Sequence, residues 1–432
     1  MFINQIPQTV VANLGEDQLK KPHSLKVAYI MSRFPKLTET FILYEMLAMQ
    51  KQGIQVEVYP LLRERTEVMH PEAAQFVEAA HYQPFVSPLI LWANLHFLLK
   101  KPRAYLETLW ILLRANWGSF GFFTGALGIF PKVVLFAYQM EAENINHVHA
   151  HFASHPAAAG FIIHNLVGIP YSFTAHGSDL HRDRHMLCEK VANAAFVVAI
   201  SDYNKELIIS ECQGNYRDKV MVIHCGVDTE VFRYRSDEIN DKKRKNPFMI
   251  LCVGTLHEVK GQAYLIEACR KLNEKNINFI CHFVGDGPDK DSLKTLADQA
   301  GLLEKIRFHG TQTRDEIARL LQDADVLVAP SVPTQDGRRE GIPVVLMEAM
   351  GSGVPVIASN ISGIPELVED GFSGLLVPPR DAMSLANALE RYYTDPNLRG
   401  RLSQAGRTKV VGDFDLYKNT AKLADQFVME VQ

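Results

Sequence analysis

The sequence lacks several features that would point to particular classes of protein. Its six cysteines form no Cys-x-x-Cys pair, and several lie inside apolar runs, which is typical of buried, reduced thiols. Such thiols fit a reducing compartment, so a cytoplasmic location is predicted. The net charge is only −4, and neither half is strongly basic or acidic. A nucleic-acid partner is therefore not expected.

Long hydrophobic runs are also missing. No stretch reaches the roughly 18–20 clean apolar residues of a membrane-spanning helix. The nearest, residues 115–131, is uncharged but is broken by four glycines and is expected to end at Pro131. Residues 1–24 have no basic start followed by an apolar core, so no signal peptide is expected and they are interpreted as a loose extension.

What the chain does contain is a repeated strand–helix–strand rhythm. Its 432 residues, 47% apolar and 22% charged, are ordinary for a globular protein of roughly two to three domains. Residues 25–31 form an apolar run with β-branched residues, 38–53 have helical spacing, and 54–61 alternate as a strand. Strands that alternate with helices predict a parallel sheet.

The rhythm runs through both halves of the chain and is interrupted once. Further strands of the first half are expected at 145–152, 171–177, 196–201 and 220–226. The charged stretch 233–247 is interpreted as a solvated linker. Strands then resume at 248–254, 278–285, 306–310, 324–331, 355–359 and 374–378. The sequence thus predicts two α/β domains, 25–232 and 248–412, and a C-terminal helix in 413–432 that packs back on the first.

Segment 84–138 departs from this pattern. It is rich in leucine and aromatic residues, with basic residues interspersed at Lys100, Lys101, Arg103, Arg114 and Lys132. One interpretation is a set of helices packed under the first domain. The other is an interfacial surface that rests on a membrane. The sequence leaves both open.

Two glycine-containing loops follow strands in the second half. Residues 253–261 carry Gly254, Thr255 and Lys260, and residues 284–293 carry Gly285 and Gly287. Ligands of parallel sheets bind beyond the carboxyl ends of the strands. Glycine allows close approach of the backbone and lysine offers a charge for phosphate, although tight turns alone would explain both loops.

A third loop of the second half carries two glutamates. Glu340 precedes Gly341, Ile342, Pro343 and Val344, and Glu348 follows inside a predicted helix. Pro343 suits the first turn of that helix, whose N-terminus would attract phosphate. The two carboxylates would accept hydrogen bonds from hydroxyl groups of a ribose or another sugar.

The first half has its own candidates at strand ends. His176 and Asp179 flank Gly177 after a strand, where a histidine could bind a sugar hydroxyl or handle a proton. Thr38, Glu39 and Thr40 begin the first helix, either as a cap or as substrate contacts.

Four histidines raise the question of a metal site. His147, His149 and His151 alternate on one face of a strand, and His155 follows, so zinc has to be considered. No cysteine or acidic cluster accompanies them in the sequence. No metal site is therefore predicted.

Taken together, these motifs resemble glycosyltransferase family four. The pieces "FTAHGSD", "HCGVDTEVF", "VGTLHEVKGQAYLIEA", "VGDGP", "EGIPVVLMEAMGSGVPVIAS" and "GIPELVEDGFSGLLVPPRD" occur in the family's order. "FPKLTETFILYEM" is similar more narrowly to exopolysaccharide transferases of the colanic-acid type. The resemblance implies two facing Rossmann-like domains, the GT-B architecture, and a retaining sugar transfer.

The resemblance also implies roles for particular residues. Glu348 would bind the ribose of the donor, Glu340 its sugar, and Lys260 its diphosphate. The backbone from Gly341 to Val344 would meet the phosphate and sugar hydroxyls. On the acceptor side stand His176, His151, Asp179 and residues 38–40.

The implied function is transfer of a sugar from a nucleotide-diphosphate sugar to a saccharide or lipid-linked saccharide. No metal cofactor is expected, because no Asp-x-Asp follows a strand. Many members of the family carry arginine where this chain has Thr255, and Arg338 or Arg339 could compensate. An epimerase or phosphorylase on the same fold, or a non-catalytic nucleotide-sugar binder, are the alternatives.

Overall fold

A computed structural model describes residues 25–36, 39–65, 69–181, 183–234 and 247–431. The predicted extension 1–24, the candidate Thr38 and most of the predicted linker lie outside the described residues. The described chain contains two six-stranded sheets, in which all neighbouring strands are parallel. The predicted α/β fold of two Rossmann-like domains is confirmed.

The first sheet has the order β2-β1-β3-β4-β5-β6. Its strands are β1 (Lys26–Phe34), β2 (Gln55–Arg63), β3 (His147–His151), β4 (Tyr171–Ala175), β5 (Val197–Ala199) and β6 (Val220–Val222). The central strands β3, β4 and β5 are buried along their whole length. Burial on both faces explains the short apolar run of β5, whereas His147 and His149 of β3 form hydrogen bonds with side-chain hydroxyl groups of β4.

The second sheet has the order β12-β11-β10-β7-β8-β9. Its strands are β7 (Phe248–Val253), β8 (Phe279–Val284), β9 (Ile306–Phe308), β10 (Val326–Ala329), β11 (Val356–Ser359) and β12 (Leu375–Val377). In each sheet the strand order reverses beside the first strand, between β1 and β3 and between β7 and β10. Ligands of such sheets bind at this reversal, beyond the carboxyl ends of the strands.

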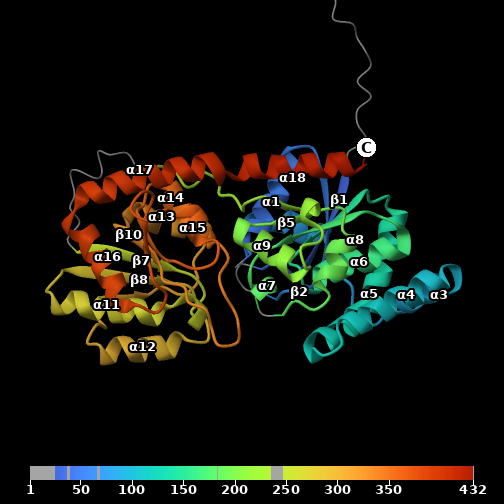
Figure 1. Ribbon diagram of the computed structural model, residues 1–432, viewed down its shortest axis with the longest axis horizontal. Coiled ribbons are helices and arrows are strands. Elements are labelled where there is room, and N and C mark those ends of the chain that lie inside the picture. Colours follow the sequence, from blue (N-terminus) through green and yellow to red (C-terminus); the bar gives the residue numbers. More distant parts are fainter. Residues whose placement is uncertain (1–24, 37–38, 66–68, 182, 235–246, 432) are drawn as a thin grey trace, which may run out of the picture.

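Helices cover both sheets (Figure 1). Those of the first domain are α1 (Thr40–Lys51), α2 (Ala74–Ala79), α3 (Pro88–Lys100), α4 (Pro102–Ala115), α5 (Phe120–Ala142), α6 (His155–Val167), α7 (Ser178–His181), α8 (Leu187–Asn193) and α9 (Asp202–Glu211). Those of the second are α11 (Gln262–Glu274), α12 (Lys290–Gln299), α13 (Arg314–Asp323), α14 (Val344–Gly351), α15 (Ile364–Leu367), α16 (Ala382–Thr394) and α17 (Pro396–Asp413). Short 3-10 turns occupy Pro71–Ala73 (η1), Arg217–Lys219 (η2) and Glu258–Lys260 (η3).

The last helix, α18 (Leu416–Val431), returns to the first domain. Figure 1 shows it in red, running along the top of the molecule from the second domain to the first. Phe427 is fully buried there, with its ring 5.0 Å from that of His147 and 5.2 Å from that of His149. The predicted crossing of the C-terminal helix is therefore present.

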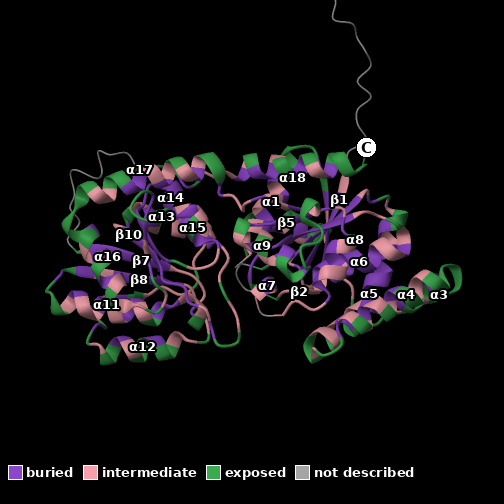
Figure 2. Ribbon diagram, viewed as in Figure 1, coloured by how far each residue is buried: buried purple, intermediate pink, exposed green. Residues whose placement is uncertain are grey.

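Segment 84–138 forms helices α3, α4 and most of α5, at one end of the molecule (Figures 1 and 2). The expectation that the apolar stretch ends at Pro131 was wrong, because α5 continues through this proline to Ala142. As a result α5 is long and apolar enough to span a membrane, although 44% of its most apolar window is buried inside the protein. Its second half, from Phe130 to Met140, belongs to the core of the first domain.

Candidate active site

A cleft of about 600 Å³ lies between the domains and receives side chains from both. It is lined by the loops after β1, β4, β7, β8, β9 and β10 and by the start of α14. The domains touch at its floor, where a Cβ added to Gly341 would stand 2.5 Å from the carbonyl oxygen of His176. No side chain longer than hydrogen fits there, so Gly341 permits the backbones of the two domains to meet.

A second contact between the domains lies beside the cleft. Glu366 of α15 accepts hydrogen bonds from the backbone N–H groups of Asp202 and Tyr203, at 2.8 and 2.9 Å. These residues form the first turn of α9, whose N–H groups have no partner within the helix. A carboxylate of the second domain therefore caps a helix of the first.

Lys260 and Glu340 stand together on the second domain's wall of the cleft. Lys260 ends the 3-10 turn η3, and Gly261 after it has φ +67°, with no room for a Cβ beside the carbonyl oxygen of Pro330. The Lys260 Nζ lies 2.8 Å from Glu340 Oε2. The cation predicted to hold a diphosphate and the carboxylate predicted to meet the sugar thus form an ion pair.

The glycines of the two neighbouring loops have packing roles. Gly254 and Gly285 have φ of +152° and +132°, and a Cβ on Gly285 would be 2.1 Å from the carbonyl oxygen of Gly254. Both line the cleft together with Thr255. Gly287 does not line it; its backbone packs against Leu256, whose carbonyl oxygen would lie 2.3 Å from an added Cβ.

Helix α14 points its N-terminus into the cleft. Pro343 immediately precedes the helix in an extended conformation instead of lying in its first turn, and Ile342, Pro343 and Val344 line the cleft. Glu348 lies further along the helix, and burial raises the pKa of its carboxyl to about 7. Glu340 and Glu348 therefore reach the cleft from a loop and from a helix, respectively.

Arg314 is a cleft residue that the sequence analysis missed. It is the first residue of α13, held by a capping box between Thr313 and Glu316, and its charge lowers the pKa of Glu348 against the effect of burial. Its guanidinium lies 3.7 Å from the centre of the Tyr44 ring, so it also joins the domains through a cation–π contact. Its position shortly after the end of β9 could have indicated it, because other cleft residues also follow the ends of strands.

Arg338 and Arg339, which could compensate for the arginine that is missing at Thr255, also line the cleft. Arg338 contacts His257 Nε2 at 2.9 Å and forms an ion pair with Asp336 at 3.0 Å. Arg339 donates to the Tyr203 hydroxyl at 3.4 Å. Both guanidinium groups are thus within the same cleft as Thr255.

His176 faces the cleft from the first domain, and the centre of its ring lies 4.6 Å from that of Phe41 and 4.8 Å from that of Phe152. Burial and the neighbouring His151 hold the pKa of His176 well below its usual value, so its imidazole is neutral. Its Nε2 lies 3.1 Å from Nδ1 of His151.

Two other predicted acceptor-side residues do not line the cleft. Asp179 accepts hydrogen bonds from the backbone N–H groups of Ala153, His176 and Gly177, so its carboxylate shapes the turn instead of meeting a ligand. His151 is fully buried behind His176. Neither side chain is therefore placed to touch a ligand in the cleft, because neighbouring backbone and side chains enclose both.

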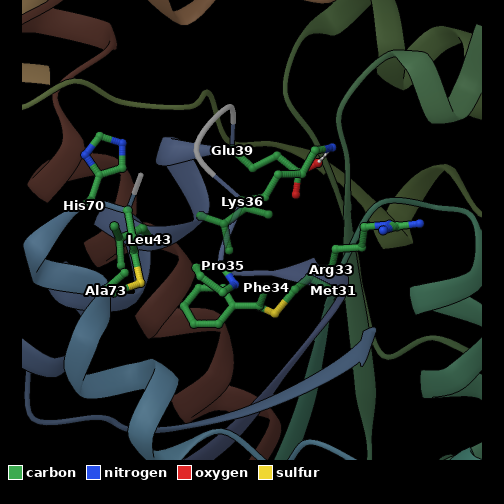
Figure 3. Close-up of a pocket in the computed structure, with 11 residues that line it drawn as sticks. Met31, Arg33, Phe34, Pro35, Lys36, Glu39, Leu43, His70 and Ala73 are labelled. Atoms are coloured by element: carbon green, nitrogen blue, oxygen red, sulfur yellow. Dashed lines mark hydrogen bonds and ion pairs between the residues drawn. The ribbon is translucent and has the colours of Figure 1, made fainter. Parts of the chain in front are cut away.

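The start of α1 reaches the cleft through Glu39 and Thr40. Glu39 does not cap the helix with its side chain; it pairs with Lys36, with 2.5 Å between Oε1 and Nζ. Both residues also border the small pocket drawn in Figure 3. That pocket holds about 20 Å³, close to the space of one water molecule, so a sugar has to use the larger cleft.

The histidines of β3 have an acidic neighbour after all. Glu45 of α1 brings its carboxylate within 4.8 Å of ligand atoms of both His149 and His151. The sequence shows no acidic cluster beside these histidines, because this single carboxylate comes from a distant helix. His147 and His155 lie outside this group.

Comparison with known proteins decides the family. Residues 38–231 match Glycosyltransferase Family 4, and residues 235–409 match the group 1 glycosyl transferases. The chain is 31% identical over 416 residues to a Salmonella typhimurium protein assigned as the colanic acid biosynthesis glycosyltransferase WcaL, covering 93% of this chain and 98% of that one. The chain is a family 4 glycosyltransferase.

Other relatives of this glycosyltransferase include the amylovoran biosynthesis glycosyltransferase AmsK of Erwinia amylovora, 35% identical over 58% of this chain and 61% of AmsK. Among solved structures, HepE of Anabaena in complex with UDP has a TM-score of 0.69 at 18% identity, covering 94% of this chain and all of HepE. At that identity the likeness shows the fold, which is the GT-B arrangement of two facing Rossmann-like domains.

Proposed function

We propose that this glycosyltransferase moves a sugar from a nucleotide-diphosphate sugar to a saccharide hydroxyl, with retention of the anomeric configuration, in exopolysaccharide or cell-surface glycan biosynthesis. The observation that carries the proposal is the convergence of Lys260, Glu340, Glu348 and the N-terminus of α14 on one cleft. The relatives named for colanic acid and amylovoran synthesis support the type of product. HepE structures with UDP and UDP-glucose support the type of donor.

The leaving diphosphate gains charge as the glycosidic bond breaks. Lys260 and the N–H groups at the start of α14 would stabilise that charge. Lys260 is already 2.8 Å from Glu340, so phosphate binding would shift this cation from the carboxylate toward the donor. Glu340 would then be released to accept a hydrogen bond from a sugar hydroxyl.

The remaining groups would orient the two substrates. Glu348 would accept from the ribose hydroxyls, and Arg338 and Arg339 would take over the phosphate contact that Thr255 does not make. His176 would contact a sugar hydroxyl. We propose no metal cofactor, and a same-face substitution in which the leaving phosphate takes the acceptor's proton, since the charges needed for the diphosphate come from the side chains of the cleft.

A donor screen tests this function first. UDP-, GDP- and dTDP-sugars are added in turn, and the melting temperature is measured, since a bound donor stabilises the folded state. Product analysis with the radiolabelled donor that binds then follows. Transfer to an added acceptor supports the proposal, an altered free sugar nucleotide would indicate an epimerase, and binding without turnover would indicate a non-catalytic binder.

We further propose that helices α3–α5 rest on the cytoplasmic face of a membrane, where a lipid-linked acceptor would be held. All three tryptophans of the chain lie in this segment, Trp92 on α3, Trp110 on α4 and Trp117 in the turn between α4 and α5, and they are 48%, 66% and 76% exposed. Leu91, Leu99 and Phe120 are 65%, 71% and 84% exposed. Exposed tryptophans and leucines with basic residues around them are typical of interfacial binding.

The basic residues of this surface divide into two kinds. Lys100, Lys101, Arg103 and Arg114 are exposed, whereas Lys132 is buried and donates to the Leu61 carbonyl at 2.9 Å. Spanning a bilayer with α5 would pull Val133 to Ala137 out of the domain core. We therefore propose contact with the membrane surface and no crossing.

Flotation with vesicles containing anionic lipid tests the membrane contact. The variant Trp110→Ser/Trp117→Ser should reduce the bound fraction at least about tenfold. The matched control is Leu303→Ser/Phe372→Ser, which removes two side chains of similar exposure, 53% and 59%, from the second domain. An equal loss of vesicle binding in both variants, or no binding by the unaltered protein at low salt, would contradict the proposed membrane contact.

A further inference from the structure

The buried histidines of the first domain lead from Glu45 to the cleft. Glu45 Oε1 lies 3.2 Å from His151 Nε2, and His151 Nδ1 lies 3.1 Å from His176 Nε2. His176 borders the cleft, whereas His151 is completely buried. The three side chains come from α1, β3 and the loop after β4.

We propose that Glu45 and His151 form a proton-ordering chain that fixes the tautomer of His176, so that its Nδ1 is an unprotonated hydrogen-bond acceptor for a substrate hydroxyl. Glu45 and His151 are then positioning residues, and His176 is the residue that meets the substrate. The substrate contact rests on the function proposed above. The tautomer itself does not.

The order of protons follows from the contacts, beginning at Glu45. Its Oε1 accepts a hydrogen bond from the Tyr29 hydroxyl at 3.0 Å, and burial and Glu45 raise the pKa of Tyr29, which stays an O–H donor. His151 Nε2 has no hydrogen-bond partner of good geometry in the described residues, yet it lies 3.2 Å from the carboxylate oxygen. Two unprotonated acceptors at that distance would repel each other, so the proton of His151 belongs on Nε2.

The rest of the chain is then determined. When His151 carries its single proton on Nε2, its Nδ1 is an acceptor, since an imidazole with one proton has one donor and one acceptor nitrogen. The 3.1 Å contact with His176 Nε2 therefore requires a proton on that nitrogen, and His176 Nδ1 is left as an acceptor. Cys225 Sγ lies 4.0 Å from Nδ1. Burial raises the pKa of this thiol to about 12, so it keeps its proton and can donate to Nδ1.

A metal ion between Glu45, His149 and His151 is the rival interpretation, since it too would satisfy His151 Nε2. The contacts of His149 disfavour it. Both of its nitrogens already face hydroxyl groups, Nδ1 that of Ser172 at 2.8 Å and Nε2 that of Thr174 at 3.0 Å. A proton on His151 needs no rearrangement of these hydrogen bonds, whereas a metal would displace at least one of them.

Nitrogen NMR of the protein labelled with ¹⁵N-histidine reads the tautomer directly, and the His176 signals are assigned by their loss in His176→Gln. At neutral pH we expect a protonated Nε2 and an unprotonated Nδ1. In Glu45→Gln the amide can donate as well as accept, so a mixed tautomer is expected. A protonated Nδ1 in the unaltered protein overturns the proposal, whether or not sugar transfer is found. So does one metal ion per chain, measured by elemental analysis and lost in Glu45→Gln.

Kinetics supply a second measurement with the donor found in the screen. Glu45→Gln should lower kcat about tenfold to a hundredfold, as for loss of one charge-assisted hydrogen bond, with a smaller change in donor KM and partial recovery in Glu45→Asp. The control is His147→Gln, since His147 lies on the same strand as His151 and is as fully buried but contacts Ser172 instead of Glu45 or His176. An equal fall in kcat for both variants would show a purely structural effect and overturn the proposal.

Discussion

The two walls of the cleft offer different chemistry to a ligand. The second domain presents charges, with Lys260, Glu340, Arg338 and Arg339 in a few loops and Glu348 in a helix. The first domain presents mainly neutral groups, with His176 beside two phenylalanines and Thr40 at a helix start. A charged wall suits a diphosphate, and a neutral, aromatic wall suits an uncharged sugar. Each difference between the walls can be tested by a substitution.

The largest expected effect is on the charged wall. Glu340→Gln should lower transfer about 100- to 1000-fold, because the carboxylate would contact the donor near the transferred carbon. Nucleotide affinity, measured by calorimetry, should change less than threefold, since Lys260 is no longer paired and stays available. The exposed Glu369→Gln on the same domain is the control. Transfer by Glu340→Gln near the unaltered rate would contradict the role given to Glu340.

A smaller effect is expected where the walls touch. An added Cβ on Gly341 would meet the His176 carbonyl oxygen at 2.5 Å, so Gly341→Ala should hold the domains apart. We expect transfer to fall about tenfold to a hundredfold, since misplacement by about 1 Å costs about that much. Gly412→Ala, whose Cβ meets no atom within 4 Å, should leave the rate unchanged. Small-angle scattering would show whether Gly341→Ala is more open.

Glu348→Gln should separate stability from binding. Its pKa is about 7 in the folded protein against 4.5 for an ordinary glutamate, so the folded state binds this proton more tightly than the unfolded state. The free energy of unfolding therefore falls from pH 4.5 to 7 through this group and stays lower above pH 7.

The variant removes that cost. Relative to the unaltered protein, Glu348→Gln should gain about 1–3 kcal/mol at pH 8 and nothing at pH 4, as measured by denaturant unfolding at both values. UDP should bind about tenfold more weakly, because a carboxylate accepts from the ribose better than an amide. A variant that is less stable at pH 8 would show that burial of Glu348 carries no such cost.

The smallest effect is expected at the contact beside the cleft. Glu366→Gln weakens the cap on α9 and should cost about 1 kcal/mol or less, with donor KM raised no more than a few-fold. The backbone amides of Asp202 and Tyr203 donate hydrogen bonds to Glu366. Their hydrogen exchange should be faster in the variant. Unchanged exchange would mean that the cap does not hold in solution.

The two walls also differ in how well the sequence predicts them. The charged wall is made by loops that directly follow apolar strands, so Lys260, Glu340 and Glu348 could be placed from the order of motifs alone. The neutral wall depends on packing between distant segments. Glu45 of α1 contacts His151 of β3. No sequence motif links these two segments, which lie far apart in the chain. Asp179 does not line the cleft for a local reason, since a short acidic side chain after a turn tends to accept hydrogen bonds from the neighbouring backbone.

Helix α18 has a consequence for how the protein is made. The first domain comes off the ribosome early, yet the face of β3 around His147 and His149 is not covered by α18 until Phe427 has been synthesised. Domains usually fold as units in order of synthesis. Here the first domain completes its core only after the second domain has been synthesised, so the second domain's wall of the cleft can form before that of the first.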